Sequence, residues 1–343
     1  MRVGILTGGG DCPGLNAVIR AVVRKGTMFY GDSILGFLEG WRGVLENRHM
    51  QLDLDAIPGI IHRGGTILRT SRTNVAKHEN GLERVKQTLE ANKIDALIAI
   101  GGDDTLGVAL KLSQVGVKVV GVPKTIDNDL AGTDFCFGFD TAVNIATEAI
   151  DRLHTTAEAH NRVMVVEVMG RDAGWIATYS GIAGGADVIL IPEKPFDLEQ
   201  VCDLLKRRHA RGKYFSIVVV AEGARYAQQD DQTTVGAKVD EFGHVRLGGI
   251  GISLAEMIEK RTGYETRAVI LGHIQRGGSP TAFDRVLATR YGVQAIDMVH
   301  QGEFARMASL QGQKLTSVPL TDALGRNRKV DPELYEMASV FFG

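Results

Sequence analysis

Short apolar runs rich in β-branched residues alternate along this chain with longer segments in which apolar residues recur every three or four positions. The short runs are apolar at nearly every position, which is typical of strands buried on both faces of a parallel sheet. The predicted strands are 3–7, 96–100, 117–122, 163–168, 188–192, 216–221 and 268–271. The longer segments are amphipathic, and they predict helices at 16–30, 83–92, 139–160, 198–211 and 282–302.

The alternation of strands and helices predicts an α/β fold with right-handed crossovers between parallel strands. A length of 343 residues allows one large domain or two ordinary ones. No segment rich in proline and serine divides the chain. The polar stretch 228–240 is interpreted as an exposed loop or hairpin rather than as a domain boundary.

Charge and cysteine content narrow the class of protein. Lys and Arg number 39 and Asp and Glu number 41, so a basic surface for nucleic acid or membrane is not expected. The three cysteines are far apart, which excludes a disulfide framework and a Cys-x-x-Cys metal site. No apolar run approaches the ~20 residues of a membrane span, and the chain starts directly in a predicted strand. We therefore expect a cytoplasmic protein.

Glycine is in excess, with 42 residues, about 12% of the chain against an average of about 7%. The runs 8–10 and 101–102 directly follow predicted strands and precede helical segments. Glycine permits close backbone approach at such a turn, and free N–H groups at a helix start can hold a phosphate. For a single glycine pair, a simple tight turn is the alternative. The first loop is not a dinucleotide fingerprint, because Pro13 replaces its third glycine, and it is not a P-loop.

Polar residues follow the predicted strands at two further points. Asp103 and Asp104 come directly after the second glycine pair, and the loop 121–129 supplies a lysine, a threonine and two aspartates. Mg²⁺ is held by one or two carboxylates together with substrate phosphates, and a spare carboxylate can take a proton from an attacking hydroxyl. These are the requirements of phosphoryl transfer, although each loop alone is also compatible with a solvated turn.

Positive charge for phosphate binding comes mainly from arginines outside these loops. Arginine forks suit phosphate, although any one of them is more often a solvated residue. The candidates, with one histidine beside them, are Arg72, Arg162, Arg171, Arg267, His273 and Arg276.

Five ordered motifs, at 6–16, 100–103, 123–129, 168–171 and 271–278, make the chain similar to the 6-phosphofructokinases from about residue 2 to about residue 300. The 225–247 insertion and the closing 340–343 resemble the actinobacterial, mixed-substrate branch of that family. The resemblance implies two Rossmann-like three-layer lobes with mostly parallel sheets. The larger, donor-binding lobe would comprise 1–138 plus about 251–305. The smaller lobe, for fructose 6-phosphate, would comprise 139–250 plus about 306–343.

The resemblance also implies residue roles. Gly10 and its loop would lie against the donor phosphates, Asp103 would bind Mg²⁺, and Asp127 would be the general base for the 1-hydroxyl of fructose 6-phosphate. Thr125 and Asp129 would position the sugar and the transferring group. Arg72 and Arg171 would neutralise charge in the transition state. The residues implied in holding fructose 6-phosphate are Thr125, Asp127, Arg162, Met169, Gly170, Arg171, Glu222, Arg267, His273 and Arg276. In the family, Arg162 and Arg267 reach across a subunit interface, so the resemblance implies a homodimer or homotetramer.

Two departures from the ATP-using pattern concern the donor. Asp104 and Lys124 each stand where ATP-using members usually carry glycine, and both resemble pyrophosphate-dependent members. A carboxylate at 104 would fill space and repel the α-phosphate of a nucleotide, whereas Lys124 would supply a cation. One close charge contact contributes a few kcal/mol at an effective dielectric near 20. Some ATP-using relatives share Lys124, so Asp104 is the more discriminating residue. The resemblance thus predicts a reversible, pyrophosphate-dependent enzyme of glycolysis and gluconeogenesis, with an ATP-dependent 6-phosphofructokinase as the alternative.

Other classes fit the residues less well. The sugar-phosphate motifs of this chain argue against a lipid or NAD kinase. Pro13 in the first loop argues against a dinucleotide-dependent oxidoreductase. A protein that only senses a sugar phosphate would not need the general base Asp127. Effector positions in the family are basic. Arg211 and Lys213 match them but His154 and Asp187 do not, so we expect weak or absent allosteric control. Nothing in the sequence explains Arg69, where the family often has glycine.

Overall fold

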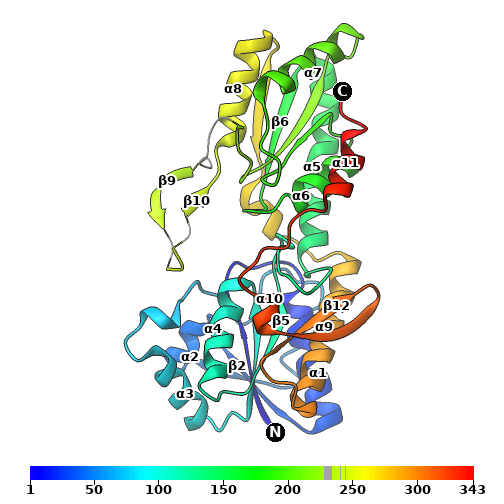
Figure 1. Ribbon diagram of the computed structural model, residues 1–343. Coiled ribbons are helices and arrows are strands. Elements are labelled where there is room, and N and C mark those ends of the chain that lie inside the picture. The colour runs from blue at the N-terminus through cyan, green and yellow to red at the C-terminus, as the bar shows by residue number, and fades with distance from the viewer. Residues whose placement is uncertain (228–233, 240, 244) are drawn as a thin grey trace.

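The computed structural model describes residues 1–227, 234–239, 241–243 and 245–343. The chain forms two lobes, each a sheet between helices, stacked end to end (Figure 1). The predicted α/β fold with mostly parallel sheets is confirmed.

The larger lobe is built on a seven-stranded sheet in which the inner strands run parallel and the two edge strands antiparallel. In spatial order the strands are β13 (Lys314–Pro319), β12 (Arg306–Gln311), β5 (Val119–Pro123), β4 (Ala96–Gly101), β1 (Arg2–Thr7), β2 (Ser33–Phe37) and β3 (His49–Leu52). The helices of this lobe are α1 (Leu15–Lys25), α2 (Trp41–Leu45), α3 (Gly81–Ala91), α4 (Asp103–Gln114), α9 (Ala282–Gln301) and α10 (Leu320–Ala323).

Both faces of the larger sheet are buried, which explains its continuous apolar runs. Along β1, Ile5 belongs to the hydrophobic cluster that includes α1 and α9, and the next residue, Leu6, belongs to the cluster that includes α4. Successive side chains of a strand point to opposite faces, so a strand that is covered on both faces is apolar at nearly every position.

The smaller lobe has a four-stranded, fully parallel sheet. Its strands, in spatial order, are β11 (Thr266–Ile270), β6 (Val163–Val168), β8 (Ser216–Ala221) and β7 (Val188–Leu190). Its helices are α5 (Phe139–His160), α6 (Trp175–Ala183), α7 (Leu198–Ala210), α8 (Ile250–Thr262) and α11 (Pro332–Ser339). The long helix α5 runs from the junction of the lobes into the smaller one (Figure 1).

The two sheets do not follow the lobe boundaries expected from the sequence. Residues 251–270 were expected in the larger lobe, but β11 pairs with β6 of the smaller sheet. Residues 306–319 were expected in the smaller lobe, but β12 pairs with β5 of the larger sheet. Sheet membership is decided by pairing between distant segments, and the order of elements along the chain does not reveal which strand becomes the neighbour.

Several elements differ locally from the predicted ones. The helix expected at 16–30 ends at Lys25, and a π-helical turn, Gly26–Tyr30, follows it. The strands β2, β3, β12 and β13 were not predicted. The hairpin interpretation of 228–240 holds for its described part, because β9 (Thr234–Val239) pairs antiparallel with β10 (Val245–Leu247); residues 228–233 and 240 lie outside the described residues. Within the described ranges, none of the helices combines the length and apolarity needed to cross a bilayer.

Candidate active site

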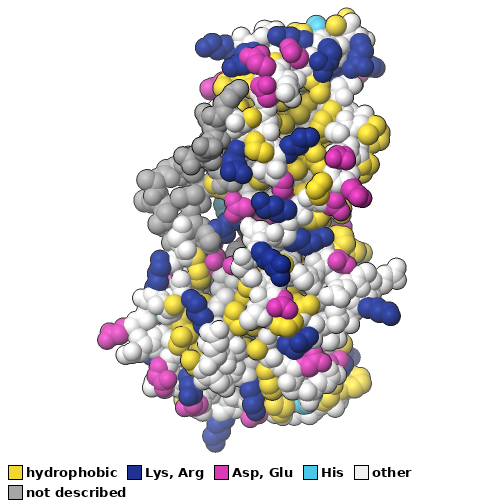
Figure 2. All heavy atoms as spheres, viewed as in Figure 1, with side chains coloured by type: hydrophobic (Ala, Val, Ile, Leu, Met, Phe, Trp, Pro, Cys, Tyr) yellow, Lys and Arg dark blue, Asp and Glu magenta, His cyan; other side chains and the backbone are white. Residues whose placement is uncertain are grey.

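The polar loops expected at the ends of the strands meet at the junction of the two lobes. Backbone hydrogen bonds tie them together: Gly8 N–H donates to Ile100 O (2.9 Å), and Lys124 N–H donates to Gly101 O (3.0 Å). On the face shown in Figure 2, basic and acidic side chains gather at this junction. The site therefore lies at the carboxyl edge of the larger sheet, where parallel α/β sheets bind ligands.

The first glycine loop is packed so closely that side chains are excluded. A Cβ at Gly8 would lie 2.6 Å from Thr105 Oγ1, and a Cβ at Gly10 would lie 2.4 Å from Arg276 Nη1. The Arg276 guanidinium also donates to Asp11 O at 3.3 Å. The loop thus presents bare backbone directly against a guanidinium, an arrangement suited to holding a phosphate.

Lys124 lies beneath this loop. Its side chain is buried, and its Nζ donates to the carbonyl oxygen of Gly10. Burial lowers the pKa of Lys124, and the neighbouring charge of Arg276 acts in the same direction, whereas Asp127 raises it. Burial also raises the pKa of the nearby Cys12 thiol to about 12, so this cysteine is neutral. Lys124 belongs to the loop that follows β5, so its bond to Gly10 O joins that loop to the first glycine loop.

The acidic loop after β5 places two carboxylates close together. Asp127 N–H donates to Thr125 Oγ1 at 3.1 Å, and the buried Oδ1 of Asp127 has no hydrogen-bond partner among the described residues. Asn128 has φ 53°, a left-handed conformation, and its Oδ1 accepts Cys136 N–H at 2.9 Å. Burial, and then the charge of Asp127, raise the pKa of Asp129 to about 7, while Arg171 opposes this shift.

The opposing side of the site is the loop after β6. Gly170 has φ 144°, and a Cβ there would lie 2.5 Å from Ala173 O. Arg171 has φ 54°, and its N–H donates to Glu222 Oε1 at 3.1 Å. Burial and the charge of Asp127 raise the pKa of Glu222 to about 7. Asp127, Asp129, Arg171 and Glu222 thus interact electrostatically across the junction.

The short helix η3 (Gly272–Arg276) completes this side. Its Gln275 is fully buried and accepts Met169 N–H at 3.4 Å, which positions Met169. His273 is exposed, and Arg276 turns toward the first glycine loop. The structure therefore brings Met169, His273 and Arg276 to the same junction as the acidic loop.

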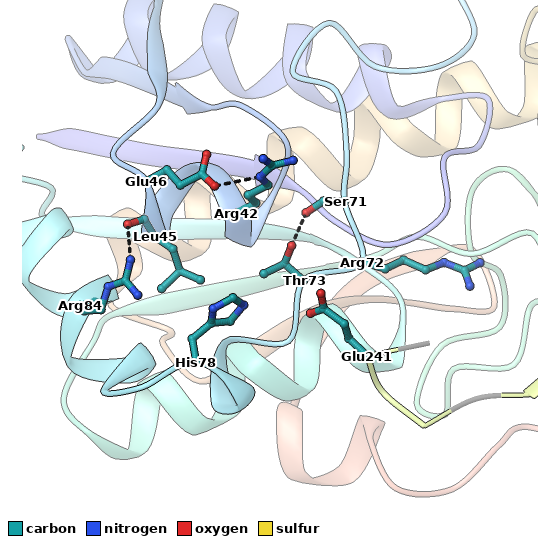
Figure 3. A pocket seen from close by; sticks show the side chains of 9 residues that line it. All are labelled: Arg42, Leu45, Glu46, Ser71, Arg72, Thr73, His78, Arg84 and Glu241. Carbon is teal, nitrogen blue, oxygen red and sulfur yellow. Dashed lines mark hydrogen bonds and ion pairs between the residues drawn. The ribbon is translucent and has the colours of Figure 1, made fainter. Parts of the chain in front are cut away.

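A cavity of about 370 Å³ opens beside the first glycine loop (Figure 3). Gly9 N–H donates to Ser71 O (3.0 Å), and Ser71 is part of the cavity wall. Figure 3 shows the Arg72 guanidinium extending away from Arg42 and Arg84. The lining residues are Arg42, Leu45, Glu46, Ser71, Arg72, Thr73, His78, Arg84 and Glu241.

The sequence model of the family named Phosphofructokinase matches residues 2–299, most of the chain. The chain belongs to the phosphofructokinase family. It is 60% identical, over 100% of both chains, to a pyrophosphate–fructose 6-phosphate 1-phosphotransferase of Streptomyces coelicolor. It is also 56% identical, over the same share, to an ATP-dependent 6-phosphofructokinase of Mycobacterium leprae.

Solved structures confirm the phosphofructokinase fold. The crystal structure of a pyrophosphate-dependent phosphofructokinase from Marinobacter aquaeolei superposes with a TM-score of 0.83 at 25% identity, covering 97% of this chain and 86% of that one. The phosphofructokinase of Pichia pastoris in the T-state superposes with a TM-score of 0.84 at 32% identity, covering 94% of this chain and 35% of that one.

Arg162 and Arg267, which the resemblance implies in holding the sugar phosphate, lie far from the acidic loop of this chain. Arg162 precedes β6 and Arg267 lies near the start of β11, at the opposite strand ends from Met169 and η3. Both bind Glu265, at 2.7 and 2.5 Å. Six steps of ~3.3 Å along β6 separate Arg162 from Val168 by about 20 Å. Within one chain these arginines do not reach the acidic loop.

The residues present fit the Mg²⁺ that the phosphofructokinase family implies. Asp103 lies exposed in the first turn of α4, with its Oδ1 accepting Gly325 N–H at 3.5 Å, and its charge acts on Asp129. In the part of the chain that the structure describes, no three His, Cys, Asp or Glu side chains form a metal cage. Mg²⁺ commonly takes one or two carboxylates and completes its shell with phosphates and water.

Sequence reasoning missed one contact of the acidic loop. Arg328 N–H donates to Asp129 O at 2.7 Å, and the Arg328 guanidinium lies over Trp175, 4.2 Å from the ring centre. The polar stretch 326–329 has no periodicity and belongs to none of the five motifs, so the sequence carries no signal for this contact.

Proposed function

We propose that this protein transfers a phosphoryl group from pyrophosphate to the 1-hydroxyl of fructose 6-phosphate, reversibly, giving fructose 1,6-bisphosphate and phosphate. The observation that carries the choice of donor is the pair of residues at the donor loops. Asp104 stands in the first turn of α4, and Lys124 is buried with its Nζ on Gly10 O. The names of the relatives at 58–60% identity support the same donor.

The donor preference follows from charge and space. The N-terminus of α4 attracts anions, but Asp104 places a carboxylate in its first turn and opposes a nucleotide α-phosphate there. Lys124 places a cation beneath the first glycine loop, where pyrophosphate, the shorter donor, would bind. Pyrophosphate needs only the cradle formed by the Gly10 loop and Lys124.

The acidic loop supplies the proton acceptor. Asp127 is the general base, because its buried, unpartnered Oδ1 is available for a substrate hydroxyl. Thr125 and Asp129 position the sugar and the transferring group. Arg171, which interacts with Asp129 across the junction, neutralises charge as the phosphoryl group moves, and Arg72 assists it from the donor side.

The sugar phosphate is held on the smaller-lobe side of the junction. Its ligands in the same chain are Met169, Gly170, Glu222, His273 and Arg276. Arg162 and Arg267 complete the site of a neighbouring subunit, which accounts for their distance from their own. The active enzyme is therefore a homodimer or homotetramer, and we place it in the cytoplasm, in glycolysis and gluconeogenesis.

Asp103 would hold Mg²⁺ together with the donor phosphates. When bound, the ion supplies charge neutralisation for the phosphoryl group. The charge of Asp103 acts on Asp129, so the carboxylate that would bind the ion lies near the acidic loop.

ATP is the second candidate donor. The mycobacterial relatives at 55–56% identity bear the name ATP-dependent 6-phosphofructokinase, and the cavity beside Gly9 has room for more than pyrophosphate. The test is a donor comparison: purified protein, fructose 6-phosphate and Mg²⁺ with either pyrophosphate or ATP, measuring fructose 1,6-bisphosphate. We expect the higher kcat/KM with pyrophosphate. A higher value with ATP overturns the proposal.

A further inference from the structure

The segment 326–330 crosses from the larger lobe back to the smaller one between α10 and α11 (Figure 1). It lies outside the matched family region, 2–299, and outside every motif used above. It nevertheless contacts the acidic loop on one side and the loop after β6 on the other.

On the larger-lobe side, the segment binds the backbone that follows Asp127. Asn327 forms an antiparallel bridge with Leu130. Arg328 N–H donates to Asp129 O at 2.7 Å, and Arg328 Nη1 donates to Asn128 O at 3.4 Å. Two successive carbonyl groups of the acidic loop are therefore held by one residue.

On the smaller-lobe side, Arg328 binds Trp175. The guanidinium carbon lies 4.2 Å from the ring centre, and Trp175 Nε1 donates to Arg328 O at 2.9 Å. Trp175 is the first residue of α6, four positions after Arg171. A second link lies next to it, because Glu193 accepts N–H groups from both Gly174 (3.0 Å) and Val330 (3.0 Å).

We propose that Arg328 is a positioning residue that fixes the Asp127–Asp129 loop relative to Arg171. It holds the two sides of the site at once, through carbonyl groups on one side and through Trp175 on the other. Asn128 has left-handed backbone, which asparagine adopts more readily than most residues, and Arg328 adds two hydrogen bonds to this turn beside the one from Cys136 N–H. The Arg328 guanidinium donates to Asn128 O and lies over Trp175, so its contacts join two segments of the site. The roles of Asp127 and Arg171 in this inference rest on the proposed function.

The test compares Arg328→Ala with Arg328→Lys, Trp175→Phe and a matched control, Arg326→Ala, which removes an exposed arginine two residues earlier in the same segment. Displacement of a reacting group by ~1 Å can cost on the order of 100-fold in rate. We expect Arg328→Ala to lower kcat by about 10- to 100-fold, with KM for fructose 6-phosphate and for the donor within about threefold. Arg328→Lys should recover part of this loss, since it can still donate to Asn128 O, and Trp175→Phe should lose less than Arg328→Ala. Arg326→Ala should match the wild type.

Hydrogen exchange gives a readout that does not depend on activity. In Arg328→Ala, amides of the peptide 124–136 should exchange faster than in the wild type, while those of the β1 strand should not. Wild-type kcat with unchanged exchange in this peptide overturns the inference. So does a loss that appears only as a higher KM, since that would make Arg328 a substrate ligand. If the wild-type enzyme uses neither pyrophosphate nor ATP, the proposed function fails, and the exchange result alone decides the role of Arg328.

Discussion

Asp127 and Asp129 interact closely enough that the charge of Asp127, added to the effect of burial, raises the pKa of Asp129 to about 7. Glu222, on the opposite lobe, responds to the same charge, and its pKa is also raised to about 7. The carboxylates of Asp127, Asp129 and Glu222 therefore repel one another most above neutral pH, when all three are ionised. Arg171 offsets part of this repulsion at Asp129.

The raised pKa values of Asp129 and Glu222 predict that the stability of the folded chain depends on pH. A carboxyl group whose pKa is higher in the folded than in the unfolded chain binds protons more readily when folded, so its contribution to stability falls as pH rises from about 4 to about 7. Asp129→Asn and Glu222→Gln remove the ionised form. Each should raise Tm by clearly more at pH 8 than at pH 5, because only the first part of this loss has occurred at pH 5. An equal shift at both pH values would contradict this account.

Asp127→Asn tests the general base. Asparagine keeps the size of the side chain but cannot accept the hydroxyl proton, so kcat should fall by roughly 10²- to 10⁴-fold. Tm should not fall, because the substitution also removes a charge that repels Asp129. Activity within tenfold of the wild type would exclude Asp127 as the base.

Position 104 tests the donor. Asp104→Gly should raise kcat/KM for ATP at least about tenfold, since a charge contact of a few kcal/mol changes binding by that much or more. Asp104→Asn serves as the matched control, because it removes the charge and keeps the volume. A gain in both variants assigns the discrimination to charge, and a gain in glycine alone assigns it to space. No gain in either means that Asp104 does not select the donor.

Gly10→Ala tests the contact between the first loop and η3. The added Cβ would lie 2.4 Å from Arg276 Nη1, so the guanidinium must move away. We expect KM for fructose 6-phosphate or pyrophosphate to rise about tenfold or more, with a small change in Tm, because φ at Gly10 is not positive. Gly107→Ala in α4 is the control: a Cβ there meets nothing within 4 Å, and the kinetic constants should stay at wild-type values.

Mixing subunits tests the placement of the two distant arginines. The double variant Arg162→Ala, Arg267→Ala and the variant Asp127→Asn should each be nearly inactive alone. If the arginines serve a neighbouring subunit, oligomers re-formed from both variants contain some complete sites, and activity should return. Active mixtures are expected only after dissociation and reassembly of the subunits. Absence of any recovery in mixed oligomers would place the function of Arg162 and Arg267 within their own chain.

The amino-acid sequence by itself determined many of the helices and strands and which residue types follow the strands. The strand Val163–Val168 and the helix Phe139–His160 have the predicted bounds, because burial on both faces or on one helical stripe imposes a repeating pattern on neighbouring residues. The loops around Gly10, Asp103 and Asp127 each follow a predicted strand, and the carboxyl ends of parallel strands lie at one edge of a sheet, so this part of the site follows from the pattern of strands.

Only the tertiary structure decided which distant segments join. It paired β12 with β5 and β11 with β6, and set Arg328 against the carbonyl group of Asp129. It also showed that Asp129 and Glu222 are buried around Asp127, which sets their pKa values. Such contacts depend on side chains and backbone groups that are far apart in the chain, and a local pattern of apolar and polar residues holds no information about them.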